Sequence, residues 1–246
     1  MSLNYEGFSI SEATQLQNKL RENIIIPERQ LIFQKQIQTN NFSSNSLTIQ
    51  TVGGADISLN LYETTIYAGI INLSFPQLIP VSYSLVKAET RFPYVPGFLA
   101  FREVPALVKV WEQLEMKPDV LVVDGHGIAH PRRLGIAAHF GAVTKQVSMG
   151  CAKNILFGKF QEPSAEKNSF TPILDKQEQI GYAFRSKSKT APVYISPGYG
   201  LGMNNSLEII QRCTGKYRIP EPTRLAHELV NRFRKGELQE GYHEIQ

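Results

Sequence analysis

The chain has 246 residues, of which 42% are hydrophobic and 20% are charged. This is the composition of a globular protein, and it excludes a disordered, collagen-like or coiled-coil chain. Lysine and arginine number 26 against 22 aspartates and glutamates, and the net charge of +4 suits a polyanionic partner without requiring one. The two cysteines, Cys151 and Cys213, cannot build a disulfide framework or a cysteine-based zinc site, and they fit a reducing compartment.

The sequence shows neither a targeting segment nor a membrane span. Its first residues lack the basic region and apolar run of a signal peptide. No uncharged apolar stretch reaches the roughly 18–20 residues that cross a bilayer. We therefore expect a cytoplasmic protein that makes no contact with a membrane.

The first expected element is an amphipathic helix over Ser11–Asn23, where apolar residues recur every three or four positions behind a serine. A polar loop, Asn40–Ser46, follows it. This loop separates an N-terminal helical arm, about residues 1–46, from a body of about residues 47–236. We expect the arm and the body to form a single domain.

The body is expected to begin with three strands and then to alternate strands with helices. The strands are rich in β-branched and apolar residues, and the helices have one apolar face. The expected strands are Leu47–Leu59, Thr65–Ser74, Gln77–Val86, Val120–Val123, Ala142–Met149, Ile180–Phe184 and Pro192–Ile195, and the expected helices are Glu103–Leu114, Ser206–Arg212 and Pro222–Arg234. This order predicts an α/β fold with a mixed central sheet, an antiparallel meander followed by parallel strands, and helices on both faces.

Three acidic residues occupy positions where a carboxylate needs a partner or a ligand. Asp56 lies inside the first strand, and Asp124 ends a buried apolar strand directly before a glycine, where open α/β sheets bind ligands. Glu103 opens a helix, where the helix dipole also accommodates an acid. Each acid alone has an ordinary structural explanation. Together they predict hard oxygen ligands for Mg²⁺ or Mn²⁺ and metal-assisted phosphodiester hydrolysis.

Seven short motifs follow one another between about Leu47 and Lys235. They are Gly53–Ser58, Phe92–Gly97, Leu99–Glu103, Val123–Gly127, Ala129–Ile136, Gly150–Lys153 and Arg218–His227. Any one of them would be weak, but seven in register resemble endonuclease V, a family of deoxyinosine-directed nucleases with a ribonuclease H-like fold. The resemblance implies that Asp56, Glu103 and Asp124 bind the catalytic Mg²⁺, for which Mn²⁺ substitutes.

The same resemblance implies the reaction. Family members act in DNA repair and hydrolyse the second phosphodiester bond 3′ to a hypoxanthine base, which leaves a 3′-hydroxyl and a 5′-phosphate. Pro93, Tyr94, Val95 and Pro96 resemble a wedge that enters the duplex, and two prolines beside an aromatic ring suit that role.

Further site residues are implied position by position. Lys153 matches a lysine near the scissile phosphate. His130, rather than His126, matches a histidine that faces nucleic acid, and Arg132 is expected to contact nucleic acid with it. The pocket for the flipped base, built largely from backbone groups, is expected at Gly97, Leu99, Gly125, Gly127, Ile136 and Gly150.

One position departs from the pattern of the family. Relatives commonly carry Ser-Pro-Gly-His near the last strand, with the histidine beside the metal, whereas this chain has Ser196-Pro-Gly-Tyr199. A phenol, with a pKa of about 10, cannot replace imidazole as a neutral base or ligand. The departure leaves two alternatives open, an inosine-specific ribonuclease of the same fold and a catalytically weakened binder of inosine-containing DNA or RNA. We expect a monomer.

Overall fold

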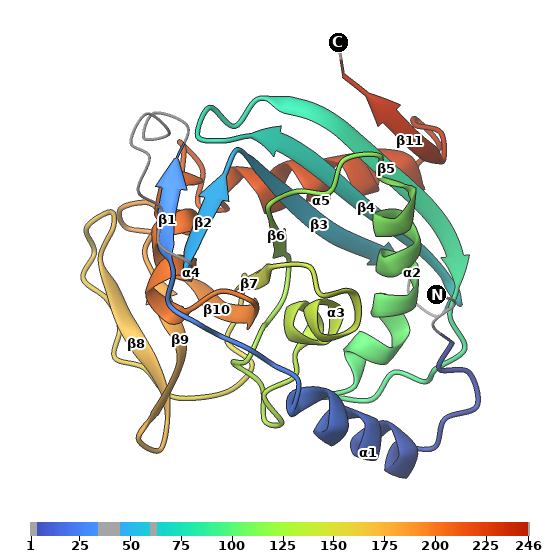
Figure 1. The fold of residues 1–246 in the computed structure, drawn as a ribbon, viewed down its shortest axis with the longest axis horizontal. Coiled ribbons are helices and arrows are strands. Elements are labelled where there is room, and N and C mark those ends of the chain that lie inside the picture. Colours follow the sequence, from blue (N-terminus) through green and yellow to red (C-terminus); the bar gives the residue numbers. More distant parts are fainter. Residues whose placement is uncertain (1–3, 34–44, 60–62, 246) are drawn as a thin grey trace.

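The computed structural model describes residues 4–33, 45–59 and 63–245. Its main feature is a nine-stranded mixed sheet with helices on both faces (Figure 1). The strands are β1 (Gln30–Phe33), β2 (Ser46–Ile49), β3 (Thr51–Leu59), β4 (Thr65–Ser74), β5 (Pro80–Glu89), β6 (Val120–Val123), β7 (Ser148–Ala152), β8 (Phe170–Asp175), β9 (Glu178–Phe184), β10 (Val193–Tyr199) and β11 (Gly241–Glu244). The helices are α1 (Ile10–Arg21), α2 (Leu99–Gln113), α3 (Ile136–Thr144), α4 (Met203–Arg212) and α5 (Glu221–Arg234).

The sheet has the order β11-β5-β4-β3-β6-β7-β10-β9-β8, and β1 pairs with β2 apart from it. β3, β4 and β5 form an antiparallel meander, from which β6 and β7 continue in parallel. Helices α2 and α3 cover one face of the sheet, and α4 and α5 cover the other. The predicted fold class is therefore confirmed.

Several expected elements have different bounds in the structure, and the largest differences concern the following. Helix α2 begins at Leu99, so Glu103 lies in its second turn rather than at its start. Phe98 and Phe101 explain this early start, because both pack into an aromatic cluster with Tyr5. The strand expected over Leu47–Leu59 is divided into β2 and β3. The strand expected over Gln77–Val86 corresponds to β5, which begins three residues later, at Pro80.

The strand expected over Ala142–Met149 is wrong. Residues up to Thr144 belong to helix α3, and β7 begins only at Ser148. Seven of the nine residues of α3 are buried, so this helix is apolar on every side and its sequence lacks the alternation of a surface helix. A short apolar run of this kind looks the same in a buried strand and in a buried helix.

The helical arm packs directly on the body. Its capping box places the start of α1 behind Ser9, whose side chain and that of Glu12 bond each other's backbone. Tyr5 Oη lies 2.8 Å from Nε2 of His139 in helix α3, and both groups are buried. These contacts support the proposal of a single domain. The polar loop expected over Asn40–Ser46 lies outside the described residues up to position 44, and Ser46 already belongs to β2.

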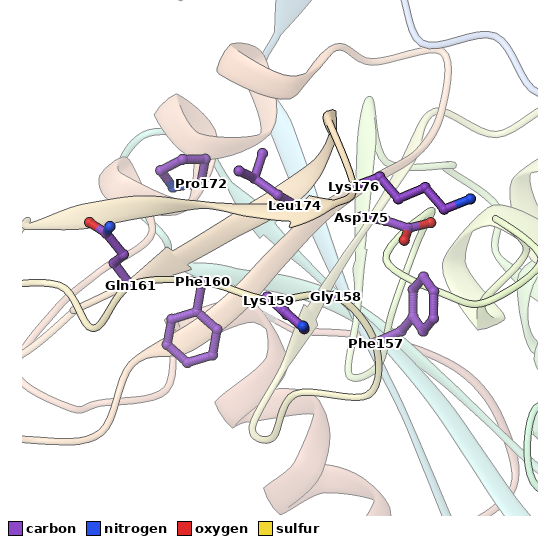
Figure 2. A pocket seen from close by; sticks show the side chains of 9 residues that line it. All are labelled: Phe157, Gly158, Lys159, Phe160, Gln161, Pro172, Leu174, Asp175 and Lys176. Carbon is purple, nitrogen blue, oxygen red and sulfur yellow. The ribbon is translucent and has the colours of Figure 1, made fainter.

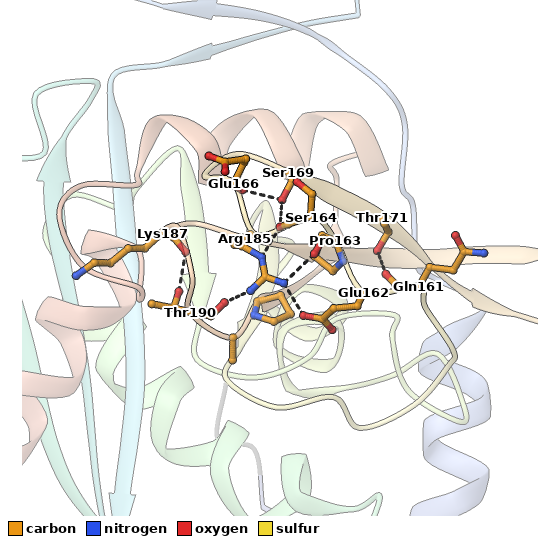
Figure 3. Close-up of polar contacts among 12 residues, drawn as sticks. Gln161, Glu162, Pro163, Ser164, Glu166, Ser169, Thr171, Arg185, Lys187 and Thr190 are labelled. Carbon is orange, nitrogen blue, oxygen red and sulfur yellow. Dashed lines mark hydrogen bonds and ion pairs between the residues drawn. The ribbon is translucent and has the colours of Figure 1, made fainter.

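The edge of the sheet at β8 and β9 is joined to its neighbouring loops by the buried guanidinium of Arg185 (Figure 3). Its Nη2 pairs with Glu162 at 2.6 Å and donates to the Pro163 carbonyl at 2.8 Å. Its Nε donates to the Ser164 carbonyl at 2.5 Å, and Nη1 donates to the Thr190 carbonyl. Because these donors are all engaged within the chain, Arg185 has a structural role.

Candidate active site

Two of the predicted acids lie side by side where the parallel pairing of β3 with β6 ends, Asp56 within β3 and Asp124 directly after β6. Ala55 of β3 is in register with Val123 of β6, so the next residue of each strand is an aspartate. The backbone N–H of Asp124 donates to the Ala55 carbonyl at 2.9 Å, which ties the two chain segments together. The side chains of Asp56 and Asp124 are only 9% and 13% exposed. The sheet therefore places two carboxylates at one poorly solvated edge.

Glu103 of helix α2 completes the acidic cluster. Burial raises the pKa of Glu103 to about 8, and the negative charges of Asp56 and Asp124 add to this shift. Burial and Asp56 also raise the pKa of Asp124, against an opposing effect of Lys153. Three carboxylates in one desolvated cluster repel one another, so the site favours a cation.

Two basic side chains contact the acids from other elements. Lys153, directly after β7, places Nζ 2.5 Å from Oδ2 of Asp124. His227 of helix α5 places Nδ1 2.7 Å from Oδ2 of Asp56, and this hydrogen bond raises the pKa of the imidazole. Arg218 Nη2 donates to the Lys153 carbonyl at 2.7 Å, which helps to hold the backbone of the lysine in place.

His227 was not expected from the sequence, although this residue ends the last of the seven motifs. The sequence feature that could have indicated its position is Gly54, two residues before Asp56. A Cβ at Gly54 would stand 1.9 Å from the carbonyl oxygen of Pro222, at the start of α5. The missing side chain lets helix α5 lie directly on β3, which brings His227 against Asp56.

Asp56, Asp124 and His227 fit a divalent metal ion. Each offers one ligand atom, and these atoms lie within 4.8 Å of one another. Carboxylate oxygens suit Mg²⁺ and Mn²⁺, and an imidazole is a ligand of transition metals as well. Glu103 of α2 lies close enough to this cluster that the charges of both aspartates raise its pKa. The donor set contains two of the three acids chosen from sequence, Asp56 and Asp124, together with His227, and the role of Glu103 as a metal ligand stays a prediction.

The segment Pro93–Pro96 projects from the protein next to this cluster. Tyr94 is 72% exposed, which is unusual for a large aromatic side chain. The carbonyl of Phe92, just before the segment, accepts a hydrogen bond of 2.7 Å from Arg102 Nη1. An exposed ring on a segment held at its base is what the wedge prediction requires.

The other end of the segment is held at one carbonyl. Gly97, whose φ of +80° favours glycine, accepts hydrogen bonds from Gln17 Nε2 at 3.0 Å, His130 Nε2 at 3.2 Å and Arg132 Nη2 at 2.7 Å. Gln17 is fully buried, and its Oε1 accepts from Arg132 Nε. His130 Nδ1 accepts from the Arg132 backbone at 3.1 Å, so both ring nitrogens are engaged. The structure gives His130 and Arg132 a role in holding this carbonyl, and their contact with nucleic acid stays a prediction.

A cavity of about 190 Å³ lies between this segment and the acids. Four of the predicted pocket residues line it, namely Gly97, Leu99, Gly125 and Ile136. Tyr94, Glu103, Asp124, His126, His130 and Leu156 line it as well. Leu156 was not expected from the sequence.

Gly127 and Gly150 are not among the residues that line the cavity, so their role as pocket residues stays a prediction. A Cβ at Gly127 would stand 1.9 Å from the Pro197 carbonyl oxygen, and one at Gly150 would stand 2.4 Å from the Gly125 carbonyl oxygen. These glycines instead allow close packing of backbone segments behind the cavity wall.

Tyr199 does not lie beside the acids, so the expectation placed on this position is wrong. Strand β10 runs antiparallel to β7, and Tyr199 pairs with Ser148, the first residue of β7. Lys153 follows the last residue of β7 and is five residues beyond Ser148, about 16 Å along the chain at roughly 3.3 Å per residue. Lys145 lies over the Tyr199 ring, 5.2 Å from its centroid. The imidazole near the acids is that of His227.

Comparison with known proteins agrees with this geometry. The sequence model of the family Endonuclease V matches residues 32–228. This chain belongs to the endonuclease V family. It is 47% identical over 192 residues to an endonuclease V of Dictyoglomus turgidum, covering 78% of this chain and 83% of the relative.

Solved structures of endonuclease V have the same fold. The Streptomyces avermitilis protein superposes with a TM-score of 0.82 at 32% identity, over 93% of this chain and 94% of that one. The Ciona intestinalis endonuclease V, solved with DNA containing an inosine followed by a ribo-adenosine, superposes with a TM-score of 0.75 at 24% identity. That match covers 93% of this chain and 98% of the other, and it shows the shared fold. Within the described ranges, no helix is long and apolar enough to cross a membrane.

Proposed function

We propose that this member of the endonuclease V family recognises deoxyinosine in DNA and hydrolyses the second phosphodiester bond 3′ to it, as a step of DNA repair. One observation carries the proposal. A single small cavity has the exposed Tyr94 on one side and the acids Glu103 and Asp124 on another. Its 190 Å³ is below the roughly 300–1,000 Å³ of drug-sized pockets and suits one base turned out of the stack.

The walls of the cavity support recognition of hypoxanthine by backbone groups. Gly97 and Gly125 have φ values of +80° and +155°, and a Cβ at Gly125 would stand 2.5 Å from the Ile136 side chain. Both glycines line the cavity without a side chain of their own, and Ile136, which also lines it, packs where a Cβ of Gly125 would stand. Hypoxanthine lacks the 2-amino group of guanine, so a close-fitting wall of this kind excludes guanine by its size.

The acids and their partners supply the chemistry. Asp56, Asp124 and His227 would hold a divalent cation, which we propose is Mg²⁺ with Mn²⁺ able to replace it. When bound, such an ion lowers the pKa of water and stabilises negative charge on phosphate. Lys153, whose ammonium group lies against Asp124, adds positive charge at the scissile phosphate. The hydrogen bond between His227 Nδ1 and Asp56 holds the two side chains next to each other, and Nδ1 would have to give up this bond in order to bind the cation.

Cleavage of matched oligonucleotides tests the proposal. Inosine-containing DNA, inosine-containing RNA and guanosine controls are incubated with Mg²⁺, with Mn²⁺ and with EDTA. We expect cleavage of inosine DNA with either metal, none with EDTA, and a loss of at least about 100-fold in Glu103→Gln. Glu115→Gln, an exposed glutamate just beyond α2, is the matched control. Cleavage of guanosine DNA at the same rate would refute the assignment of the substrate.

The RNA arm of this assay addresses the ribonuclease alternative. A catalytically weakened binder loses its main support, because Tyr199 lies at the other end of β10 and the acids are all present. The monomeric state and the cytoplasmic location stay predictions.

A further inference from the structure

A second and larger hollow, about 790 Å³, lies between the segment that follows Lys153 and the edge strand β8 (Figure 2). Lys159 and Leu174 exchange two backbone hydrogen bonds of 2.8 Å, so this segment runs antiparallel to β8. The hollow, hereafter the β8 groove, is lined by Phe157, Lys159, Phe160, Pro172, Leu174 and Lys176, among others. None of these residues belongs to the active site described above.

The charge of the β8 groove favours a polyanion. Lys159 and Lys176 are both exposed. Two acids lie nearby, Asp175 in the lining of the groove and Glu178 next to it, and both share one cation, because Arg133 Nη2 lies 2.6 Å from each of them. Within the part of the chain that the structure describes, neither lysine has an ion pair. Lys159, Lys176 and Arg133 carry three positive charges against the two negative charges of Asp175 and Glu178, so the groove and its immediate surroundings have a net charge of +1.

The rings of the groove favour a partner with flat faces. Phe157 and Phe160 are half-buried and project from the same segment, with Lys159 between them in the view of Figure 2. Phe160 is held by an edge-to-face contact with Tyr194, with ring centroids 5.4 Å apart. Arg133 lies 5.7 Å from the centroid of Phe157. Rings fixed in this way, next to cations, match the stacking sites of proteins that bind single-stranded nucleic acids.

The groove and the base cavity are lined by consecutive residues of one segment. Leu156 lines the base cavity, and the next residue, Phe157, lines the β8 groove. Arg133 forms a second link, because its backbone N–H donates to the His130 carbonyl at 2.9 Å while its side chain bonds Asp175. A strand that leaves the active site along this segment therefore enters the groove.

We propose that the β8 groove binds an unpaired stretch of the same nucleic acid strand that occupies the active site. Its bases stack on Phe157 and Phe160, and its phosphates lie near Lys159 and Lys176. This proposal rests on the proposed function, and it assigns the enzyme a second contact with its substrate, beyond the lesion.

Binding of oligonucleotides of different length tests this assignment. The probes are a short inosine-containing single strand and two longer ones, extended by about ten unpaired nucleotides on the 5′ or the 3′ side. The variants are Phe160→Leu and the pair Lys159→Ala/Lys176→Ala. The control pair, Lys109→Ala/Lys235→Ala, removes the same charge from exposed positions outside the groove.

We expect Phe160→Leu to weaken binding of one extended probe by roughly 5- to 100-fold and to leave the short probe unaffected. The lysine pair should lower the slope of log affinity against log salt by about 1.4, since each phosphate on a single strand contributes about 0.7. The control pair should leave both measurements as in the wild type. Far-ultraviolet circular dichroism of each variant confirms that the fold is retained.

The outcomes separate this proposal from the proposed function. If wild-type protein cleaves the short inosine probe and the groove variants bind all probes as the wild type does, the groove proposal is overturned and a protein partner becomes the alternative occupant. If wild-type protein does not distinguish inosine from guanosine in the short probe, the proposed function itself has failed.

Discussion

Gln17, on the helical arm, is expected to control the position of the Tyr94 segment. Its amide donates to the Gly97 carbonyl and accepts from Arg132 Nε, and the side chain is fully buried. Gln17→Leu removes both hydrogen bonds and leaves Arg132 without this acceptor. A bond to a charged group contributes about 1.5–3 kcal/mol and a neutral one about 0.5–1.5 kcal/mol. We therefore expect the free energy of unfolding to fall by about 2–4 kcal/mol.

The same substitution should affect binding of duplex more than binding of single strands. Opening a duplex requires a segment held in place, whereas an unpaired inosine needs only the cavity. Urea unfolding measures the stability, and equilibrium binding to an inosine duplex and to an inosine single strand measures the second effect. Gln17→Glu keeps the acceptor for Arg132 but loses the donor to Gly97, so its stability should lie between those of the wild type and Gln17→Leu.

Gln15→Leu is the matched control, because Gln15 is exposed on the same helix. It should unfold and bind as the wild type does. If Gln17→Leu behaves like Gln15→Leu in both measurements, the hydrogen bonds at Gly97 do not hold the segment, and the reasoning is refuted.

Three further predictions follow from the structure. Tyr94→Ala should weaken binding to an inosine duplex by about 1–3 kcal/mol per lost stack and spare an inosine single strand, and equal losses in a competition assay would argue against a wedge. Tyr199→His should leave single-turnover cleavage unchanged between about pH 6 and 9 while His227→Asn slows it, and an accelerated Tyr199→His would show that position 199 reaches the acids after all. His139 has its pKa lowered by burial to about 3, against 6.5 when unperturbed, so the unfolded chain binds one more proton between these values and stability should fall as the pH falls through that range. Urea unfolding of His139→Leu should show a shallower fall, by up to about 1.4 kcal/mol per pH unit, and parallel curves would contradict the shift.

The central strands could be predicted from the sequence because a strand buried on both faces needs a continuous run of apolar residues, and such a run is visible in the sequence. Val120–Val123 is buried throughout, and the structure places β6 at those residues. The first two acids followed from this strand and its neighbour, since Asp124 comes directly after β6 and Asp56 lies in register beside it. A local pattern was enough here because side-chain burial and strand geometry agree.

Other features depend on contacts that a local pattern does not contain. Edge strands β1, β8 and β11 were not expected, because half-exposed residues give them no continuous apolar run. In the sequence, Gly127 and Gly150 look the same as Gly125. Gly125 lines the cavity, whereas Gly127 and Gly150 pack against distant backbone segments, and the sequence alone does not show this difference. Tyr199 was placed by analogy of a short motif, whereas the antiparallel direction of β10 decides which end meets the acids.

The close approach of helix α5 to strand β3 at Gly54 also sets the width of the metal site. Asp56 is attached to the sheet and His227 to the helix, so the distance between these two ligands is the spacing of two packed backbone layers. Mg²⁺ binds its ligands at about 2.0–2.1 Å and Ca²⁺ at about 2.3–2.6 Å, and protein interiors deform little. Lys153 and Asp124 lie on chain segments that follow β7 and β6, so the spacing between helix α5 and the sheet does not fix their positions. A larger ion held by both Asp56 and His227 would need these two side chains to move apart, and the close packing of α5 on β3 would limit that movement to the side chains themselves.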